Sequence, residues 1–157
     1  DYTSTHRNPY REWIGAQIRA DGWGYACAGN PELAAEFAWR DAHWTHRANG
    51  IYGEMMFAAI IASAFVVHDA RELIAIGLSE IPRNCRLSEA VTAALDEITR
   101  CNDFHSYMDW VQLHYGDLSP VHTVNNALVV IGSMIYGQMD FHKSICTSIK
   151  KKSISHV

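Results

Sequence analysis

The stretch EWIGAQIRAD carries residue types that could bind a phosphate-containing ligand. Gly15 and Ala16 leave little side chain on the chain's surface, and Gln17 offers an amide. Arg19 adds a planar cation whose N–H groups match the oxygens of a phosphate. The same residues also fit a turn of surface helix with a solvated arginine, and their spacing alone favours this second interpretation.

The stretch HWTHRANGIYGEMM interrupts a helical pattern with two histidines and two glycines. His43 and His46 share a helix face and could both ligate a metal ion. The pair has no third ligand at a telling spacing and is not an H-E-x-x-H motif, so partly exposed helix residues are the favoured interpretation. A left-handed helix end at Asn49-Gly50 accounts for the break but leaves Gly53 unexplained.

A third polar stretch, SPVHTVNNALVV, crowds the first turn of an expected helix with His122, Thr123, Asn125 and Asn126. Free backbone N–H groups at a helix start attract anions. The two asparagines precede an apolar run, so we expect them to be partly buried, and buried amides need partners. A neighbouring loop or a ligand could supply these partners, and the sequence leaves both possibilities open.

Motifs for several other chemistries are missing from the chain. It has no D-D, D-x-D or E-x-x-E pair to hold a metal ion, and no G-x-S-x-G, P-loop or dinucleotide motif. Carboxylate-bound metals need several converging acids. The sequence therefore predicts no metal ligands within the chain.

The composition is that of one soluble domain. The 157 residues are 48% hydrophobic and 19% charged, and the net charge of −4 disfavours nucleic acid as a partner. Four cysteines without a C-x-x-C pair predict reduced thiols in a cytoplasmic protein. The longest apolar run, Met55–Val67, is shorter than the roughly 20 residues that cross a bilayer, so we expect no membrane partner.

Helical periodicity predicts that these stretches lie on an all-α domain. Asn8-Pro9, Asn30-Pro31 and Ser119-Pro120 each place a capping side chain before a proline, and Asp140 can cap a last helix. DGWGY is expected to be a loop, and the small residues of 58–64 predict a buried central helix. The expected helices cover residues 9–20, 31–48, 51–67, 70–79, 87–101, 103–115, 120–136 and 141–149.

Four stretches together resemble the ADP-ribosylglycohydrolase family, which includes dinitrogenase reductase-activating glycohydrolases and ADP-ribosyl-acceptor hydrolases. They are NPYREWIGAQIRADGWGY, GNPELAAEFAWRDAHWTHRANGIYGEMMFAAIIASAF, IGLSEIPRNCRLSEAV and PVHTVNNALVVIGSMIYGQMDFHKSI. The resemblance runs from Asn8 to Ile149. It implies an orthogonally packed, all-α single domain that removes ADP-ribose from a modified protein or small molecule with two magnesium ions.

The resemblance also implies an ADP-ribose site. IGAQIRAD is similar to the family's glycine-rich loop around the diphosphate and ribose, and THRANGIYGE to a segment whose histidine contacts ADP-ribose. His43 lies outside this match, and His122 gains no specific contact from it. The implied ligand-binding residues are Gly15, Ala16, Gln17, Arg19, His46, Tyr52 and Gly53.

The family's magnesium carboxylates come from an Asp-Asp motif and a D-x-D-(T/S) motif, and this chain has neither. We therefore expect an internal fragment, incomplete at both ends, with a partial family domain over residues 1–149 and a disordered, unrelated tail over 150–157. Such a chain is expected to be inactive, and no catalytic residue is predicted. Two alternatives stay open, an ADP-ribose-binding module without catalysis and a helical protein with a structural or interaction role.

Overall fold

A computed structural model describes residues 3–150, in which every regular element is helical. An isolated antiparallel bridge joins Trp13 to His122. The all-α prediction is confirmed. The predicted tail lies outside the described residues, apart from Lys150. The elements are η1 (a 3-10 turn, Gln17–Arg19), α1 (Ala20–Ala26), α2 (Pro31–Ala42), α3 (Asn49–Ser63), α4 (Ala70–Ser79), α5 (Arg86–Ile98), α6 (Phe104–Tyr115), α7 (Thr123–Tyr136) and α8 (Phe141–Lys150).

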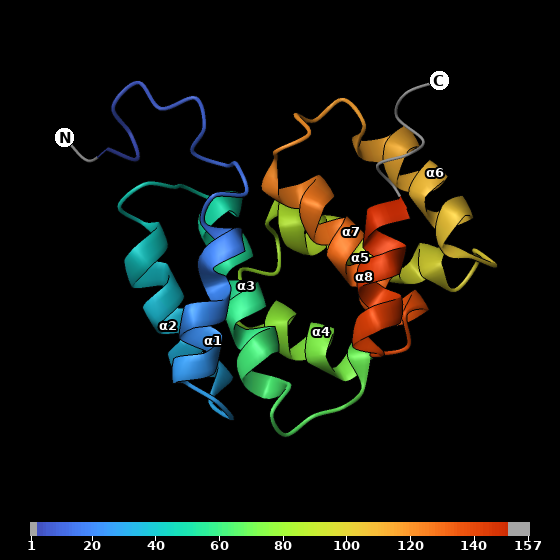
Figure 1. The fold of residues 1–157 in the computed structure, drawn as a ribbon. Helices are drawn as coiled ribbons and strands as arrows, with labels where there is room; N and C mark the ends of the chain where they lie inside the picture. Colours follow the sequence, from blue (N-terminus) through green and yellow to red (C-terminus); the bar gives the residue numbers. More distant parts are fainter. Residues whose placement is uncertain (1–2, 151–157) are drawn as a thin grey trace.

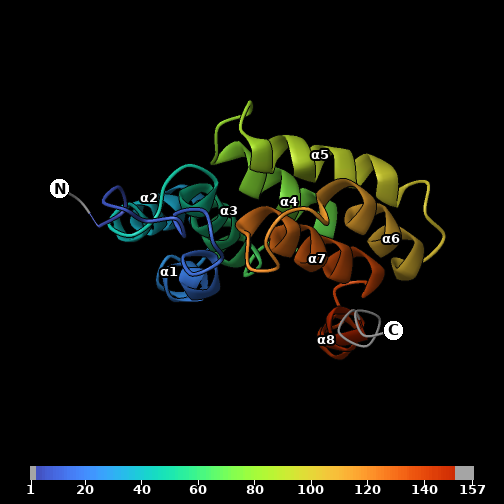
Figure 2. The same cartoon turned by 90° about the horizontal axis from the view of Figure 1, so that it is seen from above.

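Helix α3 lies at the centre of the fold (Figure 1). It packs against α1 and α2 on one side and against α4, α5 and α7 on the other. Ala58, Ala59 and Ala62 are fully buried, because their small side chains let neighbouring helices approach closely. From above, α1 and α8 are seen end-on while α5, α6 and α7 run across the view (Figure 2). The predicted central helix and the orthogonal packing are therefore confirmed.

The first predicted helix, residues 9–20, is wrong. Residues 3–16 form turns, and α1 begins at Ala20 and runs through the DGWGY stretch that was expected to be a loop. The Asn8 side chain does act as a cap, since its Oδ1 accepts from the Tyr10 N–H over 3.0 Å. That bond closes a local turn, which is the other structure that asparagine favours.

Long-range backbone hydrogen bonds explain why residues 3–16 are not helical. The Ile14 N–H donates to the Val121 carbonyl over 2.8 Å, and the Arg47 N–H donates to the Arg11 carbonyl over 2.9 Å. These groups are satisfied by distant parts of the chain, so they do not need a helical ladder. These bonds hold residues 3–16 against the residues that precede α3 and α7.

The corner between α2 and α3 is confirmed, but its details differ from the prediction. Helix α2 ends at Ala42 rather than at Ala48, and Asn49 is the first residue of α3 rather than a left-handed helix end. The positive φ falls on Ala48, at 43°. Similarly, α3 ends at Ser63 rather than at Val67.

Other helix ends depend on side-chain caps. Asn30 and Asp140 accept from the backbone of the first turns of α2 and α8, as predicted. Helix α7 begins at Thr123 rather than at Pro120, because the His122 ring is its cap and accepts from the Val124 N–H over 3.1 Å. Helix α5 is also shorter than predicted, ending at Ile98.

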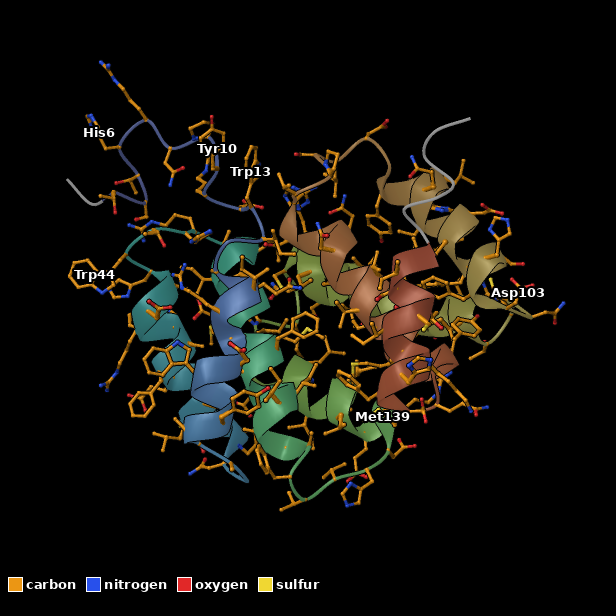
Figure 3. The ribbon with its side chains drawn as sticks, viewed as in Figure 1. His6, Tyr10, Trp13, Trp44, Asp103 and Met139 are labelled. Atoms are coloured by element: carbon orange, nitrogen blue, oxygen red, sulfur yellow. The ribbon has the colours of Figure 1, made fainter. Side chains whose placement is uncertain are left out.

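An apolar groove lies where α3 ends. Phe65, Tyr25 and Met134 of α7 line it, together with Met139 from the turn between α7 and α8, which is labelled in Figure 3. Phe65 is 55% exposed at this groove, and Val66 beside it is 66% exposed. None of the helices within residues 3–150 combines the length and apolar character needed to cross a bilayer.

Candidate functional site

The 15–19 segment joins the irregular start of the chain to α1 and packs against the first half of α3. Ala16 is fully buried in a small apolar cluster with Ala42, Ile51 and Tyr52. This cluster fixes the segment to both α2 and α3. The structure thus brings together stretches that are about thirty residues apart in the sequence.

Gly53 explains how the 15–19 segment and α7 can both reach α3. A Cβ on Gly53 would lie 2.4 Å from Thr123 Cγ2 and 3.1 Å from Gln17 Oε1, so only glycine leaves room for both neighbours. The Gln17 Oε1 and Thr123 Oγ1 atoms beside it are buried without a hydrogen-bond partner in the described part of the chain. Gln17 and Gly53 therefore lie next to each other.

Arg19 is ion-paired rather than solvated, so the surface-turn interpretation is wrong for this residue. Its Nε donates to Asp41 Oδ2 over 2.5 Å, and its Nη1 donates to the Gly15 carbonyl over 3.1 Å. Its Nη2 donates to Thr45 Oγ1 over 3.3 Å and lies 3.8 Å from Glu54 Oε2. The guanidinium links the 15–19 segment to α2, to α3 and to the corner between them.

Glu54 and Asp41 are two carboxyl groups at this site that the sequence interpretation missed. Glu54 is fully buried, and its Oε1 accepts from Trp23 Nε1 over 3.1 Å. Burial, reinforced by the neighbouring Asp41 carboxyl, raises the pKa of Glu54 to about 8. Partial burial acts to raise the pKa of Asp41 as well, but its hydrogen bonds from Arg19 and Glu54 outweigh this and hold that pKa below its usual value. At neutral pH the proton therefore resides on Glu54.

A sequence signal for Glu54 does exist. It is the single acidic residue between Ile51 and Val67, a stretch in which nearly every other position is apolar or small. A carboxyl at such a position is buried and needs a partner. Asp41 gives no comparable signal, because it sits among ordinary charged residues of α2.

His46 is buried between two glycines, with 8% of its surface exposed. A Cβ on Gly15 would lie 3.3 Å from its Nε2, and a Cβ on Gly50 would lie 3.1 Å from its Cδ2. Its Nδ1 is 2.8 Å from Thr45 Oγ1. Burial, followed by the nearby Arg19 cation, lowers the pKa of His46 against the opposing effect of Asp41, which favours a neutral imidazole.

His43 has different surroundings from His46. Its ring stacks on Trp39 with centroids 4.7 Å apart and also contacts Trp44, whose side chain points away from the molecule (Figure 3). The two histidines therefore occupy separate environments, one in an aromatic surface cluster and one inside the corner. The two rings have no neighbour in common among these contacts.

The two asparagine amides of the SPVHTVNNALVV stretch donate to carbonyls of the loop that precedes them. Asn125 Nδ2 donates to the Ser119 carbonyl over 3.0 Å, and Asn126 Nδ2 donates to the Pro120 and His122 carbonyls, each over 2.8 Å. Of the two possibilities that the sequence left open for the amides, the neighbouring loop is the one observed.

Glu12 is a further carboxyl that sequence interpretation did not single out. Its Oε2 lies 3.5 Å from His122 Nε2 and accepts from Asn49 Nδ2 over 3.0 Å. Asn49 Oδ1 in turn accepts from the Leu87 N–H over 2.9 Å at the start of α5. One buried amide thus ties the chain's irregular start to α3 and α5.

Replacing Asn49 with alanine is expected to lower the free energy of unfolding by about 2 kcal/mol, because the buried Leu87 N–H loses its acceptor and Glu12 loses a donor. Urea denaturation followed by tryptophan fluorescence measures this change. Asn102→Ala, in an exposed loop, is the matched control and should change stability by less than about 0.5 kcal/mol. Equal effects of the two substitutions would contradict the role given to Asn49.

The carboxyls of the site do not fit a magnesium ion. Within residues 3–150, no three His, Cys, Asp or Glu side chains gather in a way that could hold a metal. Magnesium prefers several ionised oxygen ligands. Asp41 is already ion-paired, Glu54 keeps its proton at neutral pH, and Glu12 is bonded to an amide and lies close to an imidazole.

The ADP-ribosylglycohydrolase family matches residues 4–151 of the chain. None of the curated proteins or solved structures is significantly similar. The match covers almost the whole sequence and agrees with the all-helical fold. The chain therefore belongs to the ADP-ribosylglycohydrolase family, whose members are hydrolases of the ADP-ribosylglycohydrolase type.

Proposed function

We propose that this chain binds the ADP-ribose group of a modified protein or small molecule, in the cytoplasm, at a surface formed by the 15–19 segment, His46 and the first turns of α3. One observation carries the proposal. The two stretches that resemble the family's ligand-binding segments are held together by Arg19, by the Ala16 cluster and by the close contact at Gly53.

The residues have different roles in this proposal. Gly15 leaves the backbone of the segment and the His46 ring open to a ligand, and Arg19 keeps N–H donors beyond those used within the chain, with 38% of its side chain exposed. These groups can donate to the diphosphate and ribose oxygens. Ala16 and Tyr52 support the segment from behind, through the apolar cluster.

We further propose that cleavage of the glycosidic bond, which the family resemblance links to magnesium, is not carried out by residues 3–150 alone. A bound magnesium ion would polarise the bond and orient the attacking water. The carboxyls at this site are ion-paired, protonated or hydrogen-bonded, and no step is assigned to them. The proposed activity of the described chain is therefore recognition.

Calorimetric titration of ADP-ribose into the chain tests the binding proposal, with free ribose as the control ligand that lacks the diphosphate. Saturable heat with ADP-ribose and none with ribose is the expected result, whereas no heat at millimolar ADP-ribose would contradict it. Magnesium-dependent release of ADP-ribose from a peptide modified on arginine or serine would show that the chain also catalyses cleavage.

Histidine substitutions locate the binding surface. We expect His46→Gln to weaken ADP-ribose binding by about tenfold, or about 1.4 kcal/mol, because it removes a buried ring donor beside Gly15. His43→Gln is the matched control, since His43 stacks on Trp39 in the aromatic surface cluster, and its binding constant should stay unchanged. The same titration measures both variants, and equal losses would move the site away from His46.

A further inference from the structure

The Thr45 hydroxyl lies between a cation and an imidazole. Arg19 Nη2 is 3.3 Å from Thr45 Oγ1 on one side, and His46 Nδ1 is 2.8 Å from the same oxygen on the other. Arg19 is itself fixed by Asp41, by the Gly15 carbonyl and by the nearby Glu54. The hydroxyl therefore sits at the end of an anchored chain of polar contacts.

The chemistry of these groups decides where the hydroxyl hydrogen goes. A guanidinium has only donors, so Thr45 Oγ1 must be the acceptor in its contact with Arg19. The positive charge also turns the hydroxyl hydrogen away from Arg19. Among the residues that the structure describes, His46 Nδ1 is the other neighbour within bonding distance of this oxygen, so the hydroxyl donates to it. A ring nitrogen that accepts a hydrogen bond carries no proton.

We propose that Thr45, held by Arg19, is a positioning residue that fixes His46 as the neutral tautomer with its proton on Nε2. The consequence for ligand recognition rests on the proposed function, in which His46 contacts ADP-ribose. The tautomer itself follows from the contacts within the chain.

The Nε2–H of this tautomer is aimed at the proposed binding surface. The nearest atoms to a Cβ on Gly15 would be His46 Nε2 and Cε1, at 3.3 and 3.4 Å, so the absence of a side chain there leaves this edge of the ring uncovered. Within residues 3–150, no group accepts a hydrogen bond from Nε2. A ring locked in this state presents one donor to an oxygen of the ligand and needs no rearrangement on binding.

The environment of the ring supports the neutral form. Burial disfavours the imidazolium, and the Arg19 cation disfavours it further, while the Asp41 carboxylate opposes both effects. The alternative tautomer would place a proton on Nδ1 and require Thr45 Oγ1 to accept two donors. Its own hydrogen would then have no acceptor among the described residues.

Nitrogen-15 NMR of the histidine rings tests the tautomer in the full 157-residue chain without any ligand. His46→Gln identifies the His46 signals by their loss. At pH 7 the wild-type ring is expected to show an unprotonated Nδ1 and a protonated Nε2. Thr45→Val, which keeps the side-chain shape at an exposed position, should give a mixture of tautomers, and Thr45→Ser should restore the wild-type pattern. A proton on Nδ1 in the wild type, or an unchanged pattern in Thr45→Val, would overturn the proposal.

A binding measurement then separates this inference from the proposed function. Thr45→Val is expected to weaken ADP-ribose binding by about fivefold, with recovery in Thr45→Ser. If the NMR result is as expected but the wild-type chain does not bind ADP-ribose, the tautomer assignment stands and the proposed function fails. If ADP-ribose binds and Thr45→Val binds equally well, Thr45 is not a positioning residue.

Discussion

Raising the pH from 6.5 to 8 is expected to lower the free energy of unfolding by about 1–1.5 kcal/mol, and Glu54 is the cause. In the folded chain the pKa of Glu54 is raised to about 8, so the carboxyl keeps its proton up to that pH. In the unfolded chain it loses the proton above its ordinary value of 4.5. The folded state therefore binds more protons in this window, and stability falls by about 1.4 kcal/mol per pH unit.

The window is chosen so that other groups do not interfere. The pKa values of His46 and His122 are lowered, so their effect on stability is largest below their ordinary value of 6.5 and has the opposite sign to that of Glu54, offsetting part of its effect at the lower end of the window. The pKa of Asp41 is lowered too, and its contribution is lost only below its ordinary value of 3.8. The raised pKa of Cys101 acts above its ordinary value of 9.0.

Glu54→Gln is the matched variant for this prediction. Glutamine can still accept from Trp23 Nε1, but it has no proton to lose. Its free energy of unfolding should not fall between pH 6.5 and 8, as measured by urea denaturation at several pH values. A flat wild-type profile would contradict the protonated state of Glu54, and a slope that persists in Glu54→Gln would assign the effect to another group.

The helices from α2 onward follow from local signals in the sequence. Asn30 before Pro31 and Asp140 cap helices where their sequence positions indicate. The apolar spacing and the small side chains of α3 predict its central place, because few other elements can be buried on all faces. These features depend on neighbours within a few residues along the chain, so they can be predicted from one sequence alone.

The start of the chain could not be predicted in this way. Asn8-Pro9 is a strong helix start, yet residues 3–16 exchange their local bonds for contacts with the α2–α3 corner and with the loop before α7. These partners lie more than thirty residues away in the sequence, so no local sequence pattern predicts the contacts. The helix then starts only at Ala20, inside a stretch whose glycines suggested a loop.

Some residues of the candidate site could likewise be predicted from the sequence, and others could not. The polar and glycine-rich stretches around Gly15 and His46 stand out because helix packing does not require them. The partners that hold them do not stand out, because Asp41 and Thr45 are common residue types on a helix and in a turn. Asp41 and Thr45 contact Arg19 only because α2 and the corner after it pack against the 15–19 segment. That packing is a tertiary contact, which the local sequence does not indicate.

Gly24→Ala is expected to destabilise the chain by about 2–3 kcal/mol, even though alanine favours a helix. A Cβ on Gly24 would lie 2.5 Å from Ile61 Cγ2, 2.6 Å from Ile61 Cβ and 3.2 Å from the Ala58 carbonyl. Ile61 Cβ and a backbone oxygen are fixed to α3, so α1 itself must move away. Because α1 carries Trp23, this shift would also disturb the hydrogen bond to Glu54.

Gly22→Ala provides the control within the same helix. Nothing lies within 4 Å of a Cβ on Gly22, so this substitution should gain helix propensity without a clash and stabilise the chain by about 0.5–1 kcal/mol. Urea denaturation of both variants gives the two changes in free energy, and their opposite signs are the decisive feature. A stabilising Gly24→Ala would mean that α1 and α3 do not pack closely at this point. The hydrogen bond from Trp23 to Glu54, which depends on this packing of α1 against α3, would then lose its support.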